Sequence, residues 1–340
     1  MDWLKPLASK GRSILAMYFL RQVLVKRILL SFFLLGGSLI AVQQQDPTTS
    51  TLSWRGCGIT KNAFMEKCAQ VYTEKTGTNI RLAGGGATLG IEAAGQGGAD
   101  FGGSCRACLT SRKEDQLPLS MTVVAWDALV VLLHPDNPLD SISPAELKAV
   151  LQQKITNWSE LGGRSGGITT IARKGISSGV GYMTRLLIFG DVDYGKQGIR
   201  LQSSGPVEEL LEETPNGIAV TGVTSARLRD LKILKIDGIE PTLENISIGK
   251  YIYHRPLYLA HSNKLNAEQR RFLDWLWGAE GQEVIRQQGT VNLEDGVSLA
   301  FKYLHWNKSI RVTNLPDLIE KAKQLIPKRN EALLNNGFSK

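Results

Sequence analysis

Between residues 50 and 300, some segments have hydrophobic residues at the spacing of a helix and others have the short apolar runs of a strand. The two kinds of segment follow each other along the chain, which predicts alternating helices and strands. Apolar residues at helical spacing predict a helix over 61–76 that ends at Gly77. A largely apolar run from 123 to 134, with 130–133 at its centre, predicts a buried strand. Shorter apolar runs predict strands at 80–82, 99–102 and 168–172. Strands that alternate with helices are typical of an α/β protein with parallel sheets.

Further helices are predicted from their start signals and their apolar stripes. Ser143 followed by Pro144 and Glu146 has the pattern of a capping box at a helix start. Apolar positions also predict helices at 89–96, from the turn at 175–181 to about 189, and as one long helix from 267 to 287. The acidic residues Glu208, Glu209, Glu212 and Glu213 are interpreted as a solvated helix face.

Four turns rich in Gly, Ser and Thr each follow a predicted strand and precede a predicted helix. In open α/β sheets, ligands bind at the carboxyl ends of strands, where helix N-termini offer N–H groups to anions. These turns therefore favour an anion-binding cleft. They lie at 56–60, 84–88, 102–105 and 175–181.

Net charge at first points toward nucleic acid, because the chain of 340 residues carries +8. Residues 1–45, however, hold six basic residues and one acidic residue, so most of the excess lies there. The remaining chain has 34 basic and 31 acidic side chains, and its basic clusters lack interleaved aromatic residues. We therefore expect no nucleic-acid partner.

The first 45 residues resemble a leader for export. Lys26 and Arg27 precede 15 uncharged, mostly apolar residues, 28–42. That run has the pattern of a signal peptide and is shorter than the ~20 residues of a spanning helix. Because the cleavage motif is poor, an uncleaved N-terminal anchor is the alternative. Either way we expect the rest of the chain in an exported compartment, the periplasm.

Several short stretches occur in one order that is specific to a known family. They are ADFG at 99–102, KITNW at 154–158, IDGIEPT at 236–242, RPLY at 255–258 and AEGQ at 279–282. On these stretches the chain, from about Leu52 to Val291, resembles the phosphate-binding proteins of phosphate ABC transporters, within the type II periplasmic binding proteins.

The resemblance implies a two-lobe α/β fold with the ligand cleft between the lobes. Lobe 1 would comprise 46–127 and 250–305, lobe 2 would comprise 128–249, and 306–340 would form a basic helical tail. It also implies a binding protein without catalysis or cofactor, which passes a small oxyanion to an ABC permease or a membrane sensor. No nucleophile–base pair is recognisable in the sequence that would favour an enzyme.

The resemblance also implies which residues hold the anion, and several of them depart from the family. Arg173 matches the arginine that pairs with phosphate, and its planar guanidinium suits two parallel hydrogen bonds. Two hydroxyl positions are now Ala87 and Val180, and the acceptor carboxylate is replaced by Cys105. Each missing bond to a charged ligand costs ~1.5–3 kcal/mol. The full predicted set is Thr60, Ala87, Thr88, Cys105, Arg173, Ser178, Gly179 and Val180.

The four cysteines leave three alternatives open. Cys68 lies on the apolar stripe of the 61–76 helix, so we expect it in the core. Cys57 falls on the turn at 56–60, and Cys105 and Cys108 fall within 102–108; together these three could bind a thiophilic metalloid or metal. A disulfide between Cys105 and Cys108, or inert thiols, would explain the same residues. A thiol-based sensor on the same scaffold is therefore the alternative function.

Overall fold

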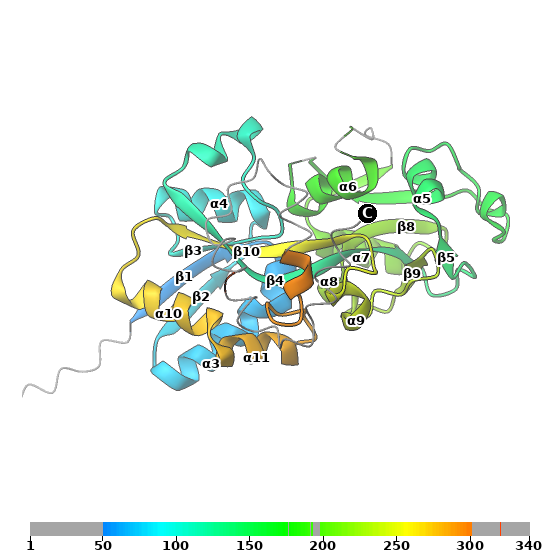
Figure 1. Cartoon of the computed structure of the whole chain (residues 1–340). Helices are drawn as coiled ribbons and strands as arrows, with labels where there is room; N and C mark the ends of the chain where they lie inside the picture. Colours follow the sequence, from blue (N-terminus) through cyan, green and yellow to red (C-terminus); the bar gives the residue numbers. More distant parts are fainter. Residues whose placement is uncertain (1–49, 176, 191, 193–197, 301–319, 321–340) are drawn as a thin grey trace, which may run out of the picture. The chain divides into compact units, whose positions relative to one another are not determined.

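The computed structural model describes residues 50–300 except 176, 191 and 193–197, together with Glu320 (Figure 1). The predicted leader at 1–45 lies outside these residues, as does all of the predicted tail at 306–340 apart from Glu320. Among the residues that are described, no helix has both the length and the apolar character needed to cross a membrane.

The first half of the sheet contains five strands in the order β2-β1-β3-β10-β4. β1 pairs in parallel with both β2 and β3, so the carboxyl ends of these three strands meet at one edge. β10 is antiparallel to both of its neighbours. The bounds are β1 Thr51–Gly56, β2 Asn79–Ala83, β3 Phe101–Ser104, β4 Leu119–Leu133 and β10 His254–Ser262.

β4 connects this half to the second half of the sheet. Its residues 119–128 pair with β10, and its residues 129–133 pair with β8. β6 then lies between β8 and β7 and is parallel to both, while β9 pairs with β4 and with β5. The second half has β5 Ser141–Ile142, β6 Thr169–Arg173, β7 Ile199–Leu201, β8 Gly217–Gly222 and β9 Lys232–Ile236.

Helices cover both faces of the first half. α4 packs against β1 and β3, whereas α3, α10 and α11 pack together on the opposite face (Figure 1). The helices of this half are α2 Gly58–Thr60, which continues through a π-helical turn at Lys61–Met65 into α3 Glu66–Thr76, then α4 Gly86–Gln96, α10 Ala267–Trp277 and α11 Ala279–Gln287. The second half has α5 Pro144–Leu151, α6 Gly179–Phe189, α7 Ser204–Glu212, α8 Val223–Ala226 and α9 Leu243–Ser247.

Most predicted elements are confirmed, and two need correction. The helix over 61–76 ends at Gly77, which has a φ of 75°, and the capping box at Ser143 forms. The single helix predicted over 267–287 is wrong, because Gly278 has extended backbone that ends α10 and begins α11. α4 begins at Gly86 rather than at 89 and therefore includes two predicted ligand residues in its first turn.

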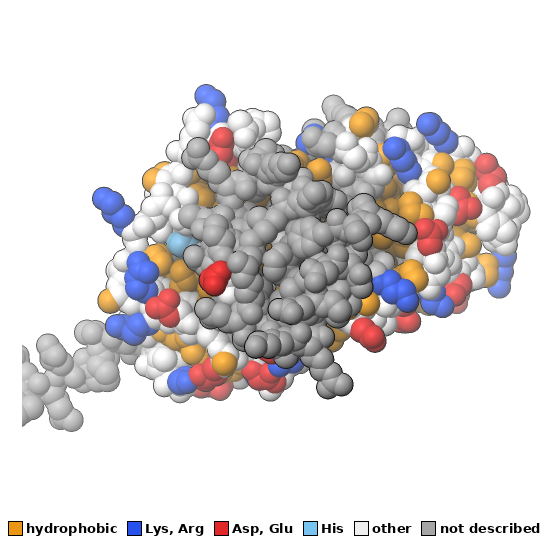
Figure 2. Space-filling view, in the orientation of Figure 1, with side chains coloured by type: hydrophobic (Ala, Val, Ile, Leu, Met, Phe, Trp, Pro, Cys, Tyr) orange, Lys and Arg blue, Asp and Glu red, His pale blue; other side chains and the backbone are white. Residues whose placement is uncertain are grey.

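A buried ion pair lies close to the point where β4 passes from one half to the other. The Arg255 guanidinium donates to the Asp127 carboxylate over 2.8 and 3.1 Å, and neither side chain is exposed. These residues face each other in the register of β4 and β10. Basic and acidic side chains are interspersed over the described surface that Figure 2 shows.

Candidate functional site

A cavity of about 520 Å³ lies where the strand ends of both halves meet the starts of α2, α4, α6 and α7. All four turns predicted from the sequence contribute to it, which confirms that they converge. The described residues that line it are Cys57, Gly58, Ile59, Asn62, Gly84, Gly85, Gly86, Ala87, Cys105, Arg173, Gly179, Val180, Gln202, Ser203, Ser204, Gly205, Glu208, Ser225, Leu228 and Arg229.

Arg173 supplies a half-buried positive charge to this cavity from the last position of β6. Its Nη1 donates to the carbonyls of Lys174 and Leu201 at 3.2 and 3.4 Å. No ion pair within the described part of the chain engages this guanidinium. Burial lowers the pKa of Arg173 from its usual 12.5, and the nearby thiols oppose that shift. Arg173 is therefore a cation that can accept an anionic ligand.

The first turn of α6 lies very close to the other half of the molecule. A Cβ on Gly179 would lie 2.3 Å from the Cys105 sulfur and 3.2 Å from the Ala87 Cβ. Such distances are shorter than non-bonded atoms tolerate, so only glycine lets α6 approach this closely. Val180, the next residue, lines the cavity and is also buried. The predicted residues Ala87, Cys105, Arg173, Gly179 and Val180 are thus brought together around one cavity.

The three predicted hydroxyl donors have partners inside the protein and are not among the lining residues. Ser178 caps α6, since its Oγ accepts the Gly181 N–H at 3.1 Å. The Thr60 hydroxyl donates to the Cys57 carbonyl at 3.0 Å and is fully buried. The Thr88 hydroxyl accepts from the Arg106 guanidinium at 2.9 Å. A ligand-binding role for these three residues stays a prediction.

The cysteines do not form the predicted three-thiol site. Cys57 and Cys105 both line the cavity and their side chains hydrogen-bond, but Cys108 lines a separate cavity with Leu109 and Glu114. Among the described residues no group of three or more His, Cys, Asp or Glu is placed to hold a metal ion. All four cysteines are free thiols, so the Cys105–Cys108 disulfide is not formed. Cys68 is fully buried in the core, as predicted.

The paired thiols differ in acidity. Burial raises the pKa of Cys57, but its hydrogen bonds with Cys105 and with the hydroxyl and N–H of Thr60, together with the charge of Arg255, outweigh burial and lower that pKa to about 6. The Cys105 pKa is raised well above 9.0, because its proton bonds to Cys57 and because it is buried. The pair therefore releases its first proton near pH 6, well below the usual 9.0 of a thiol.

We expect the thiolate absorbance of the folded protein to rise with a midpoint near pH 6. The hydrogen bond to Cys57 and burial hold the pKa of Cys105 high, and burial holds that of Cys68 high and that of Cys108 near 12. Ultraviolet titration measures this midpoint. The Cys105→Ala variant loses the donor and should titrate at higher pH, whereas Cys108→Ser should leave the midpoint unchanged.

The Cys57 pKa in the folded protein is below its usual 9.0. The stabilisation that the Cys57 thiolate gives the fold is therefore complete above pH 9 and is lost as the pH falls through about 6. A single transition near pH 9 would contradict the assignment.

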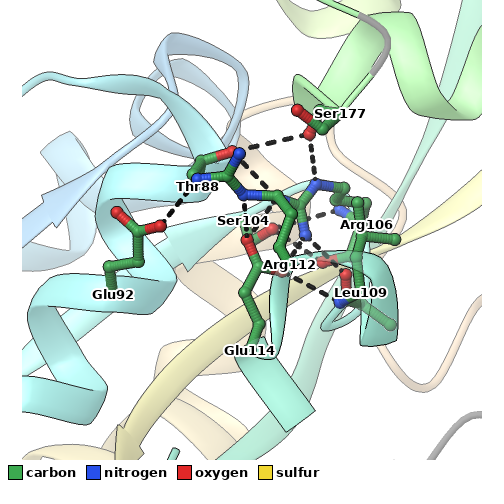
Figure 3. A network of polar contacts seen from close by, with 9 residues as sticks. Thr88, Glu92, Ser104, Arg106, Leu109, Arg112, Glu114 and Ser177 are labelled. Atoms are coloured by element: carbon green, nitrogen blue, oxygen red, sulfur yellow. Dashed lines mark hydrogen bonds and ion pairs between the residues drawn. The ribbon is translucent and has the colours of Figure 1, made fainter.

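Sequence reasoning missed a buried network beside the cavity (Figure 3). The Arg106 guanidinium forms a two-bonded ion pair with Glu114 at 2.6 and 2.8 Å, and both side chains are buried. Its Nε also donates to the Ser177 carbonyl at 2.7 Å, next to the start of α6. No motif or spacing in the sequence distinguishes Arg106 from a surface arginine, so only the tertiary contacts could find it.

Glu208 is the second residue that sequence reasoning misplaced. The predicted solvated face is wrong for this residue, which is 1% exposed and lines the cavity. Its carboxylate accepts from the hydroxyls of Thr221 at 2.6 Å and Ser225 at 2.8 Å. Burial raises its pKa, and these bonds and Arg229 oppose that shift. The sequence did contain a signal for this burial, because Glu208 lies beside Val207 on the side of α7 that also carries Leu211.

Comparison with known sequences gives a consistent group of relatives. Residues 41–280 match the family model described as the PBP superfamily domain. The chain is 24% identical over 284 residues to the "Phosphate-binding protein PstS" of Borreliella burgdorferi, which covers 79% of this chain and 100% of that protein. The protein of the same name from Bacillus subtilis is 23% identical over 252 residues, or 74% and 83% of the two chains.

Solved structures with the same fold belong to the same group. A putative phosphate ABC transporter substrate-binding protein with bound phosphate from Clostridium perfringens has a TM-score of 0.66 at 23% identity, over 72% of this chain and 99% of its own. An ABC-type phosphate transport receptor from Vibrio cholerae has a TM-score of 0.58 at 22% identity, over 72% and 100%. These likenesses confirm the predicted two-lobe α/β fold of type II periplasmic binding proteins.

Proposed function

The chain belongs to the PBP superfamily, and from this premise we propose that it is a solute-binding protein for phosphate or a phosphate-like oxyanion. In this proposal the anion is bound between two lobes and is presented to an ABC permease or a membrane sensor. The relatives named above are phosphate-binding proteins by name, which supports a role in transport rather than in catalysis.

The observation that carries the proposal is the position of Arg173. Its guanidinium faces a cavity rimmed by the starts of α4 and α6, where backbone N–H groups have no partner within the helix. A guanidinium and two helix N-termini directed at one space form an environment that favours a compact anion. Because no carboxylate of the described residues pairs with Arg173, its charge remains available for a ligand.

We further propose that the lobes follow the sequence expectation, with 46–127 and 250–305 in one lobe and 128–249 in the other. The change of partner along β4 between Ala128 and Leu129 supports this boundary. The protein would act in the periplasm, with the leader at 1–45 either removed or kept as its only attachment to the membrane.

Calorimetric titration of the purified chain with inorganic phosphate tests the proposal directly. We expect saturable binding of one phosphate per chain, weakened by salt because the attraction to Arg173 is electrostatic. Arsenate, which has the same shape and charge, should compete, and chloride at equal ionic strength is the control. If no tetrahedral oxyanion and no phosphate ester binds, the proposed function is wrong.

A further inference from the structure

The cavity continues well past Arg173, along the start of α7 and the end of α8. We call this part the extension and define it by residues 202–205 with Glu208, Ser225, Leu228 and Arg229. The extension lies next to Arg173, because Arg173 on β6 pairs in register with Leu201 on β7, and Leu201 directly precedes Gln202. A ligand held at Arg173 can therefore reach the extension without a break in the cavity.

The cavity is too large for a bare phosphate. If each of the five heavy atoms of phosphate takes the ~30 Å³ of a water molecule, the anion fills roughly 150 Å³. The cavity measures about 520 Å³, which lies in the range of ~300–1,000 Å³ typical of sites for organic ligands. More than half of the space is left for a group attached to the anion.

The two sides of the cavity are already in contact in this structure. Gly179 is packed so tightly against Cys105 that there is no room for a Cβ. The Arg106 Nε also bonds to the Ser177 carbonyl at 2.7 Å, which joins the loop after β3 to the loop before α6. α2 is also in contact with α7 and α8. The remaining volume is therefore present although the two sides of the cavity touch.

The chemistry of the extension matches a neutral, hydroxylated group. Arg229 is balanced by acidic side chains, at 2.9 Å from Glu209, 3.5 Å from Glu208 and 3.6 Å from Glu212, so it offers little charge to a second anion. The Ser203 side chain does not cap α7, and the neighbouring Gln202 and Ser204 add an amide and a hydroxyl. Leu228, which is 70% exposed, adds an apolar surface at the mouth.

We propose that the ligand is an organic phosphate monoester, whose phosphate lies at Arg173 and whose hydroxylated carbon group, such as a sugar, lies in the extension. This inference rests on the proposed function, because it needs phosphate recognition at Arg173. It goes beyond that function by naming the class of ligand. Polar groups of the extension would each gain a bond that inorganic phosphate cannot supply.

Titration of the full chain with inorganic phosphate, methyl phosphate, glycerol 3-phosphate and glucose 6-phosphate tests the proposal. We expect at least one of the two hydroxylated esters to bind about tenfold or more tightly than methyl phosphate, which equals about 1.4 kcal/mol. If inorganic or methyl phosphate binds as tightly as both hydroxylated esters, the inference is wrong and the proposed function stands. If none of the four binds, the proposed function itself fails.

A variant that fills the extension separates its role from that of the Arg173 end. A Cβ on Gly205 would meet only Arg229 at 3.7 Å and Glu209 at 4.0 Å, so Gly205→Phe can be accommodated within α7. We expect it to weaken binding of the preferred ester about tenfold or more while inorganic phosphate changes less than about twofold. Gly167→Phe, at an exposed glycine outside the cavity with nothing within 4 Å, is the matched control. Equal losses for both ligands, or no loss for either, would overturn the inference.

Discussion

Arg173→Ala should reduce the affinity for phosphate by two to four orders of magnitude and leave the fold intact. Two hydrogen bonds from a guanidinium to an anion contribute about 1.5–3 kcal/mol each, and every 1.4 kcal/mol corresponds to about a tenfold change in affinity. The loss of stability should be small, because Arg173 is only half-buried and bonds within the protein to two backbone carbonyls. Calorimetry measures the affinity, and thermal unfolding verifies the fold.

Arg164→Ala is the matched control for this experiment. Arg164 lies in the loop before β6, is exposed and does not line the cavity. Its removal changes the net charge by the same amount, so it corrects for long-range electrostatics. Arg173→Lys should restore only part of the affinity, because an ammonium group cannot form the two parallel bonds of a guanidinium. If Arg173→Ala and Arg164→Ala lose equal affinity, Arg173 does not hold the anion.

Glu114→Gln should lower the free energy of unfolding by about 3–5 kcal/mol, because it leaves the Arg106 charge buried without a counter-charge. The pair has 0% and 1% side-chain exposure, so water cannot solvate the remaining cation. The Glu114 carboxylate also accepts the Leu109 N–H at 2.9 Å, so the loop after β3 loses part of its support. Urea unfolding followed by circular dichroism measures the change.

Asp115→Asn provides the comparison, since Asp115 is the next residue and is exposed. Its effect should stay within about 0.5 kcal/mol. A double variant, Arg106→Met with Glu114→Leu, should be less destabilising than Glu114→Gln alone, because it removes both charges together. A cost of Glu114→Gln no larger than that of Asp115→Asn would show that the ion pair does not stabilise the fold.

The elements that were predictable are those whose signals lie within a few residues of one another. The Ser143 capping box and the ending of α3 at Gly77 depend on contacts across three to five residues. The long strand β4 was recognisable from its largely apolar run, because a strand buried on both faces carries few polar side chains. The helix over 267–287 was mispredicted because its apolar stripe continues past Gly278, where only the backbone reveals the break.

The candidate site was predictable in position and less so in composition. The four turns converge as expected, since the carboxyl ends of neighbouring parallel strands meet at one edge. Which hydroxyls face the cavity was not predictable, because Ser178 and Thr60 are used by their own backbone. Burial of Glu208 depends on Thr221 and Ser225, which are 13 and 17 residues away in the chain.

The sequence by itself determined the α/β class, the family, the placement of Arg173 at a strand end and the convergence of the turns. The class and the turns follow from local periodicity and turn chemistry, which act over short separations, whereas the family and the placement of Arg173 follow from the resemblance to phosphate-binding proteins. Only the tertiary structure decided that Cys57 pairs with Cys105 and not with Cys108, that Arg106 joins the two sides through Ser177, and that the cavity extends along α7. The physical reason is that cavity size and buried charge depend on how distant segments pack, and no local pattern records that packing.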